Sequence, residues 1–64
     1  MYFLKVKGKS SIPDFIQIRD ENYTLIEYFR LEKINEKLFA LNLENVNNVI
    51  DFINSSPFGI IKKI

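Results

Sequence analysis

The chain contains neither cysteine nor histidine in its 64 residues, and this absence restricts how so short a protein is held together. A domain of about 60 residues buries only about 60% of the surface that its unfolded chain exposes, so its margin of stability is small. Small domains usually compensate with disulfides, a structural metal or oligomerisation. Without cysteine and histidine, disulfides and the usual zinc ligands are excluded. Self-association or docking on a partner is therefore the expected source of extra stability.

The composition predicts a folded protein, because 47% of the residues are hydrophobic and nine are tyrosine or phenylalanine. The apolar start of the chain is interrupted by Lys5, Lys7 and Lys9, and no segment approaches the length of an export signal or a membrane-spanning helix. We expect one domain over residues 1–64, located in the cytoplasm and without a cofactor, a bound metal or a membrane contact.

Alternating hydrophobicity predicts three strands in the first half of the chain. Residues 2–7 alternate between a face with Tyr2, Leu4 and Val6 and a face with Phe3, Lys5 and Lys7. Residues 15–19 place two isoleucines on one face. The turn formers at residues 20–22 predict a hairpin and a third strand over residues 23–31. Both faces of that third strand carry apolar side chains, so one faces the core and the other is a candidate contact surface.

Residues 32–41 fit two secondary structures. The spacing of Ile34 and Leu38 is typical of a helix, whereas the alternation of Phe39 and Leu41 is typical of a strand. We favour a strand over residues 37–42.

A clearer helix is predicted over about residues 43–54, with Asn42 as its N-cap and Glu44 near the positive end of its dipole. Its apolar stripe consists of Leu43, Val46, Val49, Ile50 and Ile53. A last strand is predicted over residues 58–64, beside the first. The expected fold is α+β: a small two-layer domain in which one main helix covers one face of a mostly antiparallel sheet of four or five strands.

Residue types for catalysis are scarce. Gly8-Lys9-Ser10 follows a strand as in a phosphate-binding loop, but Phe3 stands where that loop needs another glycine, so a turn is expected. No histidine is available to activate a serine. Glu27 lies in the middle of the third strand, where we expect a structural pair with Arg19 or Arg30. The chain is therefore predicted not to be an enzyme.

The surplus of apolar residues favours protein docking, either in a homodimer or as an accessory subunit of a larger assembly. If both faces of the sheet are apolar, their apolar surface is larger than one helix can cover. An uncovered sheet face of this kind usually marks a protein interface. The candidate contact residues are Tyr28, Phe29, Phe39 and Phe58.

The charge distribution suggests an alternative, nucleic-acid binding. Residues 1–9 and 62–64 hold five lysines and no acidic residue, whereas residues 10–61 hold four basic and eight acidic residues. If the first and last strands are neighbours, Lys5, Lys7, Lys9, Lys62 and Lys63 converge and can contact a phosphate backbone. Protection of an exposed sheet edge by lysine explains the same pattern and is the favoured interpretation.

Overall fold

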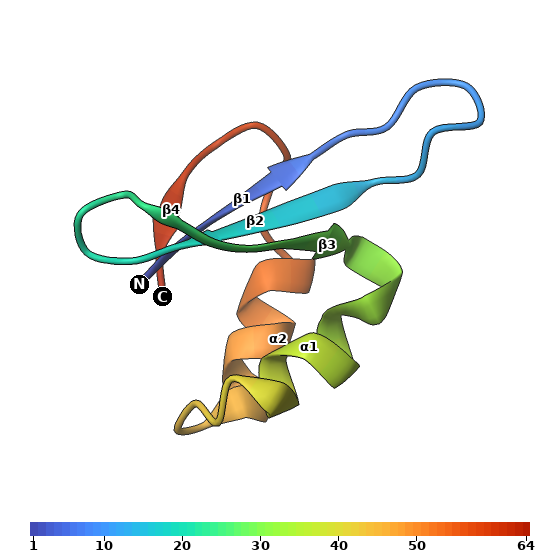
Figure 1. Cartoon of the computed structure of the whole chain (residues 1–64). Coiled ribbons are helices and arrows are strands. Elements are labelled where there is room, and N and C mark those ends of the chain that lie inside the picture. The colour runs from blue at the N-terminus through green and yellow to red at the C-terminus, as the bar shows by residue number, and fades with distance from the viewer.

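The computed structural model describes residues 1–64 and shows a small α+β fold of two layers. Its elements, in chain order, are β1 (Tyr2–Val6), β2 (Phe15–Arg19), β3 (Leu25–Arg30), the short 3₁₀ turn η1 (Leu31–Lys33), α1 (Ile34–Ala40), α2 (Val46–Asn54) and β4 (Lys62–Lys63). The strands form one antiparallel sheet in the order β3-β2-β1-β4. Both helices lie on the same side of this sheet (Figure 1). None of the helices is long and apolar enough to cross a membrane.

The pairing of β1 with β2 sets which side chains enter the core. Phe3 lies opposite Ile18 and Lys5 lies opposite Ile16. Burial alternates along both strands, and these four side chains are the buried ones. Ile16 and Ile18 thus share one face as predicted, and this face points into the core. The buried face of β1 is the one that carries a lysine.

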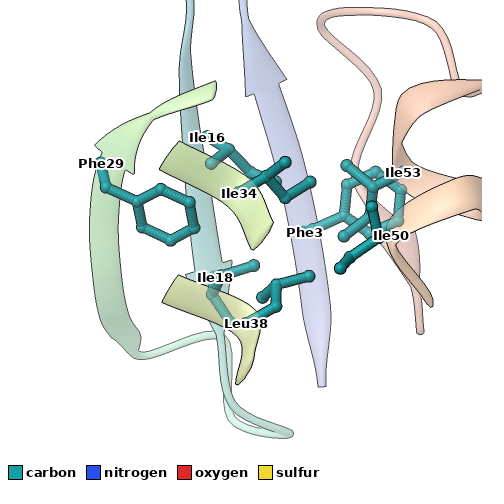
Figure 2. Close-up of a cluster of buried hydrophobic side chains, with 8 residues drawn as sticks. All are labelled: Phe3, Ile16, Ile18, Phe29, Ile34, Leu38, Ile50 and Ile53. Carbon is teal, nitrogen blue, oxygen red and sulfur yellow. The ribbon is translucent and has the colours of Figure 1, made fainter. Parts of the chain in front are cut away.

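Eight apolar side chains form the core, and the two helices cover different parts of the sheet. In Figure 2, Ile34 and Leu38 of α1 lie over the β2 and β3 side chains, whereas Ile50 and Ile53 of α2 lie against Phe3. Four strands about 4.8 Å apart make a sheet roughly 14 Å across, and one helix is only about 10 Å wide. A second helix is therefore needed to cover the β3 side.

The predicted strand over residues 37–42 is wrong, because residues 34–40 form α1. The helical spacing of Ile34 and Leu38 directs both side chains into the core, and Phe39 is left 55% exposed. A strand would have buried Phe39 instead. Residues 34–40 are helical rather than extended because the helix covers Phe29 and its neighbours on the sheet. This packing joins residues that are not local in sequence, so the local pattern does not reveal it.

Asn42 does not cap the second helix. It has a φ of 57°, follows the last turn of α1, and its N–H donates to the Phe39 carbonyl at 3.1 Å. A left-handed residue at this place is a common way to end a helix, and asparagine tolerates that conformation. The helix α2 begins only at Val46, after a second left-handed residue, Asn45. The last strand is also shorter than predicted and pairs with β1 only at Tyr2 and Phe3.

Lys5 ties the end of α2 to the sheet. Its Nζ donates to the carbonyl oxygens of Ser56 at 2.8 Å and Asn54 at 3.3 Å, and lies 4.5 Å from the centre of the Phe58 ring. The last carbonyls of a helix lack partners within the helix and carry its negative dipole end. A buried ammonium satisfies both requirements, so Lys5 acts as a cap contributed by a distant strand.

Gly8 makes the tight connection between β1 and β2 possible. A Cβ at this residue would lie 2.0 Å from the carbonyl oxygen of Ile12, a distance that no side chain tolerates. The Gly8 N–H donates to Asp14 Oδ1 at 2.8 Å, and the same carboxylate lies 3.6 Å from the Lys7 ammonium. The predicted turn is confirmed here, and Gly8-Lys9-Ser10 leads into no helix.

Candidate docking surface

The face of the sheet opposite the helices is uncovered, and we call it the open face. The helices α1 and α2 both lie on the other side of the sheet (Figure 1). Residues directly opposite each other in neighbouring strands share a face. By this pairing, the open face consists of Tyr2, Leu4, Val6, Phe15, Gln17, Arg19, Leu25, Tyr28, Arg30 and Lys63.

Two aromatic pairs dominate the open face. The Phe15 and Tyr28 rings stack with centroids 4.9 Å apart and an interplanar angle of 25°. Tyr2 packs against Tyr23, which belongs to the β2–β3 loop, with centroids 4.6 Å apart. Leu4 and Val6 of β1 are half-buried on the same face. The open face thus has an apolar centre among polar and charged side chains, and no second layer lies on it.

The Asp20 side chain holds the loop conformation that places Tyr23 on this surface. Its Oδ1 accepts hydrogen bonds from the N–H groups of Asn22 at 2.8 Å and Thr24 at 3.0 Å. Such a side-chain turn holds the residue between them in a left-handed conformation, and Tyr23 has a φ of 63°. Arg19 then donates to the Tyr23 carbonyl at 2.8 Å.

Arg19 is a cation at this end of the open face, and it forms no ion pair with an acidic residue. Its second guanidinium nitrogen donates to Gln17 Oε1 at 2.8 Å. The guanidinium is therefore held in place by neutral acceptors, and no carboxylate neutralises its charge.

The strand β3 is an outer strand of the sheet and carries much of the exposed apolar surface. Leu25 and Ile26 are 45% and 44% exposed, and Tyr28 is 52% exposed. A bulge between β2 and β3 inserts Ile26 as an extra residue, since Ile18 pairs with Glu27 and Arg19 pairs with Leu25. The edge from Glu27 to Arg30 is regular.

Only part of the predicted contact set lies on one surface. Tyr28 lies on the open face, but Phe29 is 6% exposed and belongs to the core, so its assignment to a contact surface is wrong. Phe39 is exposed on α1, in the other layer of the fold. Phe58 is half-buried beneath the ammonium groups of Lys5 and Lys7.

The five lysines do not converge on one patch. Lys5 is only 3% exposed, so its assignment as a surface lysine is wrong. Lys7 is exposed and pairs with Asp14, and Lys9 lies in the exposed β1–β2 loop. Lys62 pairs opposite Phe3 and lies over the Phe52 ring on the helix side, whereas Lys63 lies over the Tyr2 ring on the open face. The first and last strands are neighbours as expected, but the pleat sends Lys62 and Lys63 of β4 to opposite faces of the sheet.

The predicted ion pair of Glu27 is also absent. Arg19 donates to Gln17 and Tyr23, and Arg30 lies 3.5 Å from Glu32 instead. Two shallow pockets are present, of about 410 Å³ beside β1 and about 350 Å³ beside Pro13, and Glu27 lines neither of them.

Sequence reasoning missed Phe15, Arg19 and Leu25 as members of the open face. The signal for Phe15 and Arg19 was present, because residues that alternate with Ile16 and Ile18 must face away from the core. The side of Leu25 depends on the bulge, which no local pattern marks.

One end of the open face has a cluster of charges around Glu21, and this cluster gives a testable pH dependence. The hydrogen bond from the Met1 ammonium lowers the pKa of Glu21 below its ordinary value, and Lys63, 3.8 Å away, lowers it further. A lowered folded-state pKa contributes stability above the ordinary glutamate value, and this is lost as the pH falls through the lowered value. In an NMR titration of the side-chain carboxyl, the Glu21 midpoint should lie below the ordinary glutamate value. Acetylation of the Met1 amine should raise this midpoint, and an unchanged midpoint would contradict the assignment.

A scan against protein-family models, a search of curated proteins and a search of solved structures each found no match to this chain.

Proposed function

We propose that this protein acts without catalysis, by docking another protein surface against the open face. The observation that carries the proposal is a sheet face with two aromatic pairs and no covering layer. Exposed apolar surface of this kind marks interaction sites in folded proteins. Aromatic residues and arginine, both present here, are also the residue types enriched at interface hot spots.

The size of the chain supports the same proposal. Only eight apolar side chains are buried in the core, and no disulfide reinforces it. Burial of the open face against a partner removes further apolar surface from water at about 25 cal/mol per Å². Docking would thus provide both the function and part of the stability.

The lysine-based alternative has less support than docking. Nucleic-acid binding through the terminal strands needs a continuous basic surface, and Lys5, Lys7 and Lys62 are engaged with helix carbonyls, Asp14 and Phe52 respectively.

Site-specific photocrosslinking in the native cell tests the docking proposal. A photoreactive phenylalanine analogue replaces Tyr28 on the open face, and a matched control carries it at Asn47, an exposed residue of α2. We expect discrete crosslinked products at Tyr28 and none at Asn47. Equal crosslinking at both positions, or none at Tyr28, would contradict docking through the open face.

A further inference from the structure

The two outer edges of the sheet differ in charge. At one edge, both residues of β4 are lysines, and the exposed Lys7 comes directly after β1. Lysines on an exposed edge prevent it from pairing with another strand. At the other edge, β3 has the sequence LIEYFR, with no lysine and no proline. Lysine protection is therefore confined to the β4 edge, and the bulge on β3 is confined to Ile26, which leaves residues 27–30 with regular strand geometry.

The backbone of β3 presents outward hydrogen-bonding groups along residues 27–30. The Leu31 N–H donates to the Asp14 carbonyl at 2.9 Å, toward the β2 side. Successive residues of a strand direct their backbone groups to alternate edges. The N–H and C=O groups of Phe29 therefore point toward β2. The N–H and C=O groups of Tyr28 and the N–H of Arg30 point away from β2, to the outside of the sheet. The sheet order places no further strand on that side.

The charges of β3 are compatible with pairing to a second copy of itself. Two identical strands pair antiparallel about a two-fold axis. Residues 27–30 of β3 lie beyond the bulge and have regular strand geometry. Along them, the outward N–H and C=O groups of the two copies lie opposite each other when the two-fold axis passes at Tyr28 or at Phe29. Glu27 then faces Phe29 or Leu31 of the second copy, and Arg30 also faces an uncharged residue in both registers. No like charges lie opposite each other, which would be unfavourable.

We infer that two copies of this chain join through β3, so that their two four-stranded sheets become one continuous sheet. This inference rests on the proposed docking function and names a second copy as the occupant of the β3 edge. Pairing places the Phe15–Tyr28 stack of each copy next to the same stack of the other, and aromatic cross-strand neighbours stabilise a sheet. The two open faces then form one larger apolar surface, which neither chain has alone.

Analytical ultracentrifugation of the full chain over micromolar to millimolar concentrations tests this dimer. We expect the mass to double from 7.6 kDa as the concentration rises. Tyr28→Lys places a lysine on the edge and should give a monomer at every concentration. The matched control is Phe39→Lys, which changes an equally exposed ring on α1 and should leave the dimer unchanged.

Two further measurements separate loss of pairing from loss of folding. A chemically synthesised chain with an N-methylated Tyr28 amide loses only an outward N–H, so it should fold, as judged by circular dichroism, and remain monomeric. In the unmodified chain, hydrogen exchange at the Tyr28 amide should slow as the concentration rises.

A wild-type monomer throughout the series would overturn the inference, as would a dimer that survives both Tyr28→Lys and N-methylation. Such a monomer would leave the docking function intact if photocrosslinking at Tyr28 still yields products with another protein. Loss of those products as well would overturn both proposals.

Discussion

Replacement of Lys5 by glutamate is expected to remove most of the protein's free energy of unfolding. The substitution removes the ammonium that binds the Asn54 and Ser56 carbonyls and places a carboxylate against the negative end of α2. A buried charge without a partner costs about 3–5 kcal/mol. Small domains have total stabilities of about 5–15 kcal/mol, and a core of this size places the protein at the lower end.

Chemical denaturation followed by circular dichroism measures this effect, with Lys7→Glu as the matched control. The Lys7→Glu substitution makes the same change of charge two residues away, on a side chain that is 69% exposed. We therefore expect it to lower the free energy of unfolding by no more than about 1 kcal/mol. Lys5→Met, which retains most of the side-chain volume, should fall between the two, with a cost of about 1–3 kcal/mol for the unpaired carbonyls. Equal stability of the Lys5→Glu and Lys7→Glu variants would refute the capping role of Lys5.

Leu38→Ala is expected to lower the free energy of unfolding by about 2–5 kcal/mol, the range found for leucine truncation in well-packed cores. Leu38 is fully buried between α1 and the sheet. The neighbouring Phe39→Ala removes a larger side chain but one that is mostly exposed, so it should cost well under 1.5 kcal/mol.

This pair of variants distinguishes a helix from a strand over residues 34–40. In a strand that alternates as Phe39 and Leu41 do, Phe39 would be the buried residue and its truncation the damaging one. Thermal unfolding of the two variants side by side measures the order of the two effects. A larger loss for Phe39→Ala than for Leu38→Ala would contradict the packing of α1 described above.

Much of the sheet was predictable from local patterns. The strands β1, β2 and β3 lie within the predicted ranges, and Ile16 and Ile18 face the core as their spacing indicates. Alternation with period two is a direct consequence of strand geometry, so it is visible without knowledge of the partner strands. The β1–β4 pairing was predicted as well, although β4 is only two residues long.

The position of the candidate site was less predictable, because it depends on which face of each strand the helices cover. Alternation separates Phe3 and Lys5 from Leu4 and Val6, but it does not say which side is the core. Phe29 and Tyr28 posed the same question on β3, since both are large and aromatic. The position of α1 settles it for Phe29, and the capping of α2 settles it for Lys5.

The absence of cysteine and histidine determined, from the sequence alone, that no disulfide and none of the common zinc sites holds this protein together. Local periodicity determined the first three strands and the apolar stripe of α2. Tertiary structure decided the rest: that residues 34–40 are helical, that Lys5 is a buried helix cap, and that the aromatic side of the sheet has no cover. These properties depend on contacts between residues far apart in the chain, such as Lys5 with Ser56, whereas the periodicity of a segment reports only its own geometry.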